Sequence, residues 1–135
     1  FLVIAYREIR RLELEWLEAL HPKTLTGTGE ERRQGVIDLS LLALVDVGQF
    51  HGIEYEEFPA RIAEVAMWMT DHIANNILAM AFGQTFARIP LRQSANIRHG
   101  DALEVDWAEV LPPEKCSHVV GNPPFVGQSY QSSAQ

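Results

Sequence analysis

The stretch "QFHGIEYEEFPARIAEVAM", residues 49–67, joins two kinds of hydrophobic pattern. Its first part, residues 49–55, is short and apolar and runs into acidic residues, which is typical of a strand. From Pro59 the apolar residues recur at helical spacing, and proline is well suited to the first turn of a helix. We expect this helix to run to about Phe82, with Gly83 as its stop. A strand followed directly by a helix is the unit from which α/β folds are built.

A second long helix is expected at about residues 1–20. Its charged residues Arg7, Arg11, Glu15 and Glu18 should face solvent, with a weak pair between Arg11 and Glu15. The residues expected to be buried are Leu2, Tyr6, Ile9, Leu12 or Glu13, Trp16 and Leu20 in this helix, and Ile62, Val65, Ala66, Met67, Trp68, Met69, Ile73 and Ile77 in the other.

The remaining segments are shorter. Residues 21–35, rich in Pro, Gly and Thr, predict an exposed loop, and residues 36–47 could be strand or helix. Residues 95–103 predict a brief strand with a Gly-Asp turn, residues 106–116 a short helix or turn, and residues 117–121 a final strand. Strands that alternate with helices pair in parallel, so the expected fold class is α/β.

The composition fits a single soluble globular domain. The chain has 135 residues, 47% of them hydrophobic, and no apolar run long enough to span a membrane. Its single cysteine excludes an internal disulfide and favours a reducing, cytoplasmic location. The net charge of −7 argues against a nucleic-acid-binding surface within this chain, because phosphate contacts require clustered Lys and Arg. The five histidines and the cysteine lack metal-ligand spacing, so no metal is expected.

Glu54, Asp101 and Asn122 each lie at the end of a predicted strand, and ligands of parallel α/β sheets bind at the carboxyl ends of strands, so all three are expected at one edge of the sheet. Glu54 could accept both hydroxyls of a ribose, or be an ordinary exposed carboxylate. Tyr55 could pack on a purine face, or belong to the core. Asp101 could accept from the exocyclic amine of an adenine, or cap a turn.

The last predicted strand leads into "GNPPFVG", residues 121–127. The side-chain oxygen of Asn122 and the carbonyl of Pro123 are two acceptors that could hold a planar exocyclic amine and localise its lone pair. Pro124 stiffens the turn. Phe125 could stack on a base taken out of its duplex. The alternative is an ordinary Asn-Pro turn.

In this order, the groups resemble those of the class I S-adenosylmethionine-dependent DNA methyltransferases that act on amino groups, in particular the type IIG-like restriction–modification enzymes. "GNPPFVG" is similar to their catalytic Asn-Pro-Pro-aromatic motif, "HGIEYEEFPARIAEVAMWM" to their ribose-binding acidic motif and following helix, and "HGDALEVDW" to the motif that holds the cofactor's adenine. The resemblance implies an incomplete Rossmann-like three-layer sandwich with a mostly parallel sheet. It implies adenine-N6 methylation of double-stranded DNA as the reaction of the parent protein.

The resemblance also implies a role for each group. Glu54 would hold the ribose hydroxyls of S-adenosylmethionine, and Asp101 would accept from the adenine amine. The other implied residues are Tyr55, Ala102 and Leu103 around the adenine, and Asn122, Pro123, Pro124 and Phe125 in the catalytic turn.

Part of the family's catalytic domain is expected to lie outside this sequence. "FLVIAYREIRRLELEWL" is similar to the segment that comes after the family's glycine-rich cofactor loop. Residues 1–135 are therefore expected to begin just after that loop and to end just after the Asn-Pro-Pro-Phe motif, with a flexible tail at 127–135. We expect the chain alone to be inactive and to contact DNA mainly through other parts of its parent. An exposed sheet edge could also lead to homo-oligomers.

Two alternative functions stay open. The Asn-Pro-Pro-aromatic turn also occurs in methyltransferases of protein glutamine and of guanine in ribosomal RNA. The chain could instead be an inactive half-domain that serves only as an interaction module. Binding of S-adenosylmethionine by the intact protein would separate an enzyme from such a module.

Overall fold

A strand and a helix follow one another as the stretch at 49–67 predicts, and a second strand lies within the predicted segment 95–103. The computed structural model describes residues 1–21, 43–82 and 95–121. Strand β1 (His51–Glu54) leads into helix α5 (Glu57–Ala81), and strand β2 (Asn96–His99) pairs with β1 in parallel. The predicted parallel pairing is therefore confirmed, and the mixture of helices and parallel strands is compatible with the α/β class.

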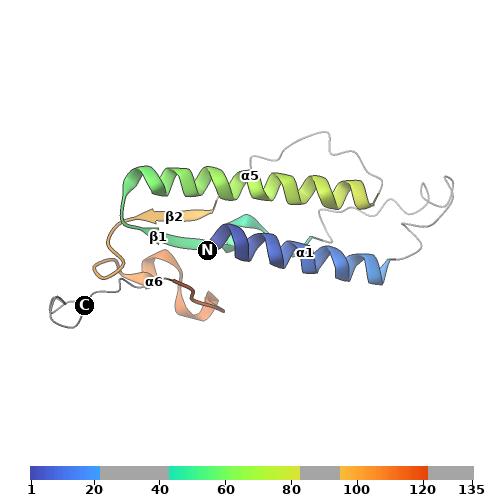
Figure 1. Ribbon diagram of the computed structural model, residues 1–135. Coiled ribbons are helices and arrows are strands. Elements are labelled where there is room, and N and C mark those ends of the chain that lie inside the picture. Colours follow the sequence, from blue (N-terminus) through green and yellow to red (C-terminus); the bar gives the residue numbers. More distant parts are fainter. Residues whose placement is uncertain (22–42, 83–94, 122–135) are drawn as a thin grey trace, which may run out of the picture.

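The two long helices pack against each other and against the sheet (Figure 1). Helix α1 (Leu2–Leu20) runs beside α5, and α5 also contacts both strands. The Rossmann-like three-layer sandwich stays a prediction, because the described residues contain only these two strands. Among the described helices, none combines the length and the apolar character needed to cross a membrane.

The main core lies where the first half of α1 meets α5 and the sheet. Tyr6 is fully buried there, and its ring meets that of Phe50 edge-on, with 5.0 Å between the ring centroids. Gly52 allows β1 to approach α1 closely. A Cβ at this position would lie 3.0 Å from Leu2 Cδ1 and 3.1 Å from Ile97 Cδ1. The absence of a side chain at Gly52 therefore allows the helix and the sheet to pack closely.

Both helices bury a different face from the predicted one. The α1 helix buries Tyr6, Arg10 and Leu17, while α5 buries Ala60, Met67, Leu78 and Ala79, so only Tyr6 and Met67 are confirmed as fully buried. Each helix is apolar around much of its circumference, and periodicity alone cannot tell which part of a wide apolar arc meets the core. The residues predicted to be buried but found exposed are Ile9, Leu12, Trp16 and Leu20 in α1, and Ile62, Val65, Met69, Ile73 and Ile77 in α5.

Short helical turns flank the strands. The 3₁₀ turn η1 (Val47–Gln49) precedes β1, and residues 106–116 contain helix α6 (Trp107–Val110) and the 3₁₀ turn η2 (Pro113–Lys115), as predicted. The Asp106 side chain caps α6 by accepting a hydrogen bond from the Ala108 N–H at 2.9 Å.

The predicted strand at residues 117–121 is wrong for the described structure. Val119 and Val120 are 67% and 60% exposed, and the segment has no strand conformation. A strand requires a hydrogen-bonding neighbour, and no described backbone group bonds to the backbone of these residues. Most of the predicted loop at 21–35, and residues 36–42 of the ambiguous segment, lie outside the described residues.

Candidate functional site

The carboxyl ends of β1 and β2 bring two predicted site residues to one edge of the sheet. The strands are in register at their ends, where Glu54 lies opposite His99. The Gly100 N–H extends this pairing by donating a hydrogen bond of 2.9 Å to the carbonyl of Glu54. Asp101 is the next residue, so backbone bonding holds its turn beside the end of β1.

Asp101 forms a tight turn with the residues that follow it. Its Oδ1 accepts a hydrogen bond from the Leu103 N–H at 2.9 Å, and its carbonyl accepts from the Glu104 and Val105 N–H groups at 3.0 and 2.8 Å. The turn-forming role that the sequence left open is therefore present. Among the described residues no group donates to Oδ2, so this oxygen can still accept from a ligand.

Gly100 is needed where β2 ends and this turn begins. Its φ of 157° is a conformation that residues with side chains rarely adopt, and a Cβ there would lie 2.7 Å from Val105 Cγ2. Any side chain at this position would displace the turn that carries Asp101.

The Glu54 side chain is partly buried, and its Oε1 accepts only a long hydrogen bond of 3.3 Å from the Glu56 N–H. Tyr55 is 69% exposed, so the alternative that it belongs to the core is wrong. Ala102 and Leu103 are also exposed, on the turn after β2. Apolar surface is therefore available on both turns of the edge.

These groups fit the nucleoside part of the cofactor that the resemblance implies. A ribose diol and an aromatic amine both donate hydrogen bonds, and the carboxylates of Glu54 and Asp101 can only accept them. The exposed side chains of Tyr55 and Leu103 offer apolar surface that a purine could cover. The donor and acceptor chemistry of the edge is thus complementary to an adenosine group.

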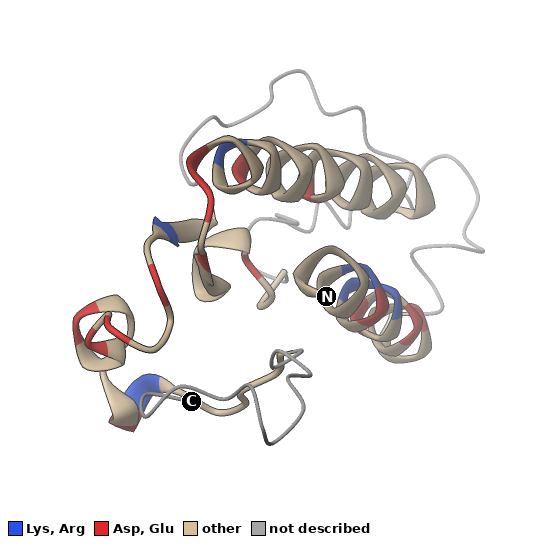
Figure 2. Cartoon of the chain, turned by 60° about the vertical axis from the view of Figure 1, so that its left-hand side comes forward, with Lys and Arg blue, Asp and Glu red and all other residues tan. Residues whose placement is uncertain are grey.

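The edge is strongly acidic (Figure 2). Acidic residues gather in the turns after β1 and β2 and around α6, whereas three of the arginines lie on α1. Phosphate groups require clustered cations, so this edge suits hydroxyl and amino donors and does not suit a DNA backbone. The acidic residues concerned are Glu54, Glu56, Glu57, Asp101, Glu104, Asp106 and Glu109.

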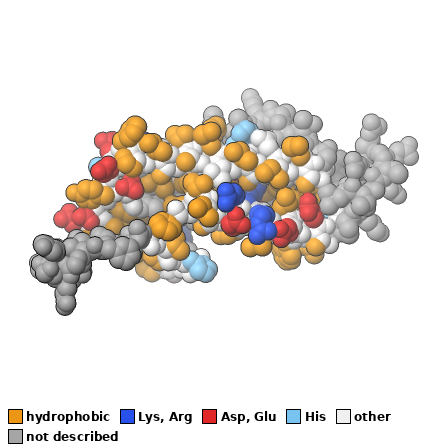
Figure 3. Space-filling view, in the orientation of Figure 1, with side chains coloured by type: hydrophobic (Ala, Val, Ile, Leu, Met, Phe, Trp, Pro, Cys, Tyr) orange, Lys and Arg blue, Asp and Glu red, His pale blue; other side chains and the backbone are white. Residues whose placement is uncertain are grey.

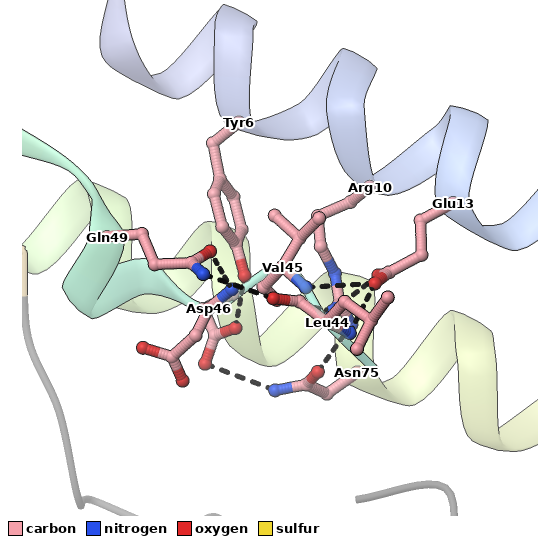
Figure 4. Close-up of polar contacts among 9 residues, drawn as sticks. Tyr6, Arg10, Glu13, Leu44, Val45, Asp46, Gln49 and Asn75 are labelled. Carbon is pink, nitrogen blue, oxygen red and sulfur yellow. Dashed lines mark hydrogen bonds and ion pairs between the residues drawn. The ribbon is translucent and has the colours of Figure 1, made fainter. Parts of the chain in front are cut away.

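A buried polar network joins α1 to α5 and to the segment before β1 (Figure 4). Arg10 is only 5% exposed, and its guanidinium donates to Glu13 Oε2 at 2.8 Å, to the Val45 carbonyl at 2.7 Å and to Asn75 Oδ1 at 2.6 Å. The other oxygen of Glu13 accepts from the Leu44 and Val45 N–H groups at 2.6 and 2.9 Å. The network therefore ties down the backbone that leads into η1 and β1.

Tyr6 and Asp71 extend this network towards the core. The Tyr6 hydroxyl donates to Asp71 Oδ1 at 2.5 Å, and Asp71 Oδ2 accepts from Asn75 Nδ2 at 3.1 Å. Burial, together with this bond to Asp71, raises the pKa of the Tyr6 phenol well above its ordinary value, so it stays a donor.

This network is not among the features predicted from the sequence. A signal was available, because Tyr6, Arg10, Glu13 and Leu17 follow the 4-3-4 spacing of one helix face. An arginine and a glutamate on the same face as a buried tyrosine indicate a paired, buried cluster.

A groove of about 460 Å³ lies over β2 and α6. Neither Glu54 nor Asp101 lines it, so it is separate from the edge described above. The buried Nδ1 atom of His51, one of its lining residues, has no hydrogen-bond partner among the described residues. The lining residues are His51, Glu64, Ala95, Asn96, Ile97, Arg98, Val105, Glu109 and Val110.

The predicted catalytic turn, Asn122, Pro123, Pro124 and Phe125, lies outside the described residues, as does the predicted tail at 127–135. The structure therefore brings Glu54 and Asp101 together but leaves their relation to Asn122 a prediction. Within residues 1–21, 43–82 and 95–121, no group of three or more His, Cys, Asp or Glu residues is placed to hold a metal ion.

Comparison with known proteins identifies the family to which the chain belongs. The model of the MmeI DNA-methyltransferase domain matches residues 1–135. DNA methyltransferase A of Bacillus subtilis (strain 168) is 30% identical over 135 residues, which cover 98% of this chain and 14% of that protein. No solved structure matches the chain. Since the family model covers the whole sequence, the chain belongs to the MmeI DNA-methyltransferase domain family.

Proposed function

We propose that the full-length protein transfers a methyl group from S-adenosylmethionine to the N6 amine of adenine in double-stranded DNA. Family membership supports methylation of DNA rather than of protein glutamine or ribosomal RNA. The cofactor part of the proposal rests on one structural observation. Glu54 and the Asp101 turn lie together at one edge of the sheet.

The edge supplies the groups that bind and orient the cofactor. Glu54 accepts hydrogen bonds from the ribose hydroxyls, and Asp101 accepts from the adenine amine through the oxygen that its turn leaves free. Tyr55, Ala102 and Leu103 lie against the purine. When bound, the cofactor supplies an electrophilic methyl group on a positively charged sulfur.

Residues 122–125 bind and orient the target base. The Asn122 side-chain oxygen and the Pro123 carbonyl accept hydrogen bonds from the two hydrogens of the target amine, which favours a pyramidal nitrogen with a localised lone pair. Pro124 keeps this turn rigid, so that the acceptors are preorganised. Phe125 stacks on the base after it has left the duplex.

The DNA duplex is held mainly by other parts of the parent protein. The described edge is acidic, and contacts to DNA phosphates need clustered cations. Residues 1–135 therefore contribute few phosphate contacts. The chain spans only 14% of the length of the relative that it matches. We further propose that the parent protein is a cytoplasmic enzyme of the restriction–modification type. Residues 1–135 are inactive without the rest of that protein.

The test is methyl transfer by the full-length protein with labelled S-adenosylmethionine and duplex DNA, followed by mass spectrometry of the nucleosides. We expect N6-methyladenine as the product. Asn122→Ala should lower the rate by about 10²–10³-fold while the cofactor still binds, because one preorganised acceptor is lost. Asn76→Ala, a change on α5 away from the edge, is the matched control. DNA left unmodified, or a methylated nucleoside other than N6-methyladenine, would contradict the proposal.

A further inference from the structure

The outer face of α5 is unusually apolar. From Ile62 to the end of the helix, every exposed residue has a large hydrophobic side chain. Exposure ranges from 49% at Ile77 to 78% at Met80, and Phe58 in the first turn is 76% exposed. We call this surface the α5 stripe, which consists of Phe58, Ile62, Val65, Met69, Ile73, Ile77 and Met80.

The α5 stripe lies on the opposite side of the helix from the core. Its members follow each other at intervals of three or four residues, which keeps them on one face. Met67, which is buried, falls between Val65 and Met69 and therefore points away from them. Figure 3 shows hydrophobic side chains gathered along α5. A helix that is apolar on two opposite faces is typical of one packed between two layers of protein.

The exposed side of helix α1 differs from the α5 stripe in charge. It has several exposed apolar side chains, but it also carries Arg7, Arg11 and Glu15, with exposed ion pairs that include Arg11 with Glu15. On α5 the only exposed polar residues are Glu57 and Arg61, both near its start. The absence of charge from the rest of the outer face is thus a property of α5 and not of the chain as a whole.

We propose that the α5 stripe packs against another segment of the same full-length polypeptide, outside residues 1–135. The matching region makes up only 14% of the Bacillus subtilis relative, so a protein of this kind has ample further chain to cover the stripe. The stripe extends over about 33 Å, given a rise of about 1.5 Å per helical residue. The expected occupant is therefore a segment with a long apolar face of its own, such as an amphipathic helix.

The charges on α5 argue against a membrane surface or DNA as the occupant. Helices that lie on membranes carry Lys and Arg along their polar face, and DNA contacts also require cations. The charged residues of α5 are Glu57, Glu64 and Asp71 against a single Arg61, which pairs with Glu64 at 3.1 Å. A tethered segment also has a higher effective concentration than a second molecule.

Site-specific photo-cross-linking in the full-length protein tests the proposal. A benzophenone amino acid is placed at Ile73, within the α5 stripe, or at Arg7, on the charged face of α1, as the matched control. Equal amounts of unlabelled and ¹⁵N-labelled protein are mixed before irradiation, and cross-linked peptides are identified by mass spectrometry. A cross-link within one molecule always joins two peptides of the same isotope, whereas cross-links between two copies also include pairs of mixed isotope.

We expect Ile73 to cross-link to a peptide outside residues 1–135 with a single isotope label, and in higher yield than Arg7. Mixed-isotope pairs would overturn the proposal in favour of a dimer of this chain. Equal yields from both positions, or no cross-link from Ile73, would also overturn it. As a second readout, Ile73→Glu should lower the melting temperature of the full-length protein, because a covered site buries the carboxylate; an unchanged melting temperature would count against a covered stripe.

Discussion

The Gly100 N–H donates a hydrogen bond of 2.9 Å to the carbonyl of Glu54. This bond extends the β1–β2 ladder by one step beyond the last paired residues, Glu54 and His99. It fixes the start of the Asp101 turn relative to the end of β1. The two carboxylates proposed to hold the cofactor are thus positioned by backbone bonding rather than by contact between their side chains.

Gly100→Ala should therefore disturb the edge. The added Cβ would lie 2.7 Å from Val105 Cγ2, and the backbone would have to leave its φ of 157°. Overpacking of this kind typically costs about 1–3 kcal/mol of unfolding free energy. We expect that loss in chemical denaturation, together with weaker S-adenosylmethionine binding in calorimetry. Gly121→Ala is the stability control, since among the described residues no atom beyond its chain neighbours lies within 4 Å of the added Cβ. Equal stability of the two variants would refute this role for Gly100.

Asp101→Asn separates the two roles of Asp101. The asparagine oxygen can still accept from the Leu103 N–H, which is now bonded at 2.9 Å, but the NH₂ group cannot accept from an adenine amine. We expect stability to change by less than about 0.5 kcal/mol. The dissociation constant for S-adenosylmethionine should rise about tenfold, as a loss of about 1.4 kcal/mol implies. Asp101→Ala should lose both stability and affinity. If Asp101→Asn binds the cofactor normally, Asp101 only shapes the turn.

Glu54→Gln tests the other carboxylate in the same assay. The variant keeps the size of the side chain but replaces one acceptor with a donor, which a ribose diol does not need. We expect cofactor affinity to fall about tenfold with little change in stability, because Glu54 makes only a long contact with the Glu56 N–H. Glu56→Gln, two residues further on, should bind the cofactor as the wild type does. Comparable affinities for both variants would place the ribose site elsewhere.

Local sequence patterns predicted the elements that build the edge. The strand at 51–54, the helix at 57–81 and the strand at 96–99 were all expected from short apolar runs, helical spacing and Pro59. These patterns depend only on residues that are close together in sequence. The rule that parallel strands end at one edge of a sheet then predicts that Glu54 and Asp101 lie near each other.

Features that depend on distant contacts were not predicted. Both faces of α5 carry apolar residues at helical spacing, so the pattern selected Ile62 and Met69 for the core where the structure selects Ala60 and Leu78. The apolar run at 117–121 lacks a neighbouring strand in the described structure, and apolar composition alone does not make a strand.

Arg10 and Arg11 are neighbours in sequence but should differ greatly in their effect on stability. The Arg10 side chain is 4% exposed and that of Arg11 is 55% exposed. Arg10→Met removes three hydrogen bonds and leaves Glu13 buried without its cation, which typically costs about 3–5 kcal/mol. Arg11→Met breaks only exposed pairs with Glu8 and Glu15, worth less than about 1 kcal/mol each. Thermal unfolding of the two variants compares them directly. Similar melting temperatures would mean that the Arg10 network contributes little.

Tyr6→Phe should show a stability defect that depends on pH. The phenol donates to Asp71 at 2.5 Å, and a hydrogen bond to a charged group contributes about 1.5–3 kcal/mol, so the variant should be less stable by about that amount near neutral pH. Burial and the Asp71 bond raise the pKa of Tyr6 in the folded protein above its unfolded value of about 10.

Because the folded pKa is the higher one, the unfolded state loses its proton first as the pH rises. The stabilisation by Tyr6 is therefore complete below about pH 10 and decreases above it, by up to about 1.4 kcal/mol per pH unit. The variant has no phenol at this position and lacks this decrease, while the other titrating groups are the same in both proteins. Urea unfolding from about pH 8 to about pH 11 should thus show the gap between wild type and Tyr6→Phe narrowing at the alkaline end. A gap that stays constant or widens would mean that the Tyr6 phenol is not held protonated by its buried bond to Asp71.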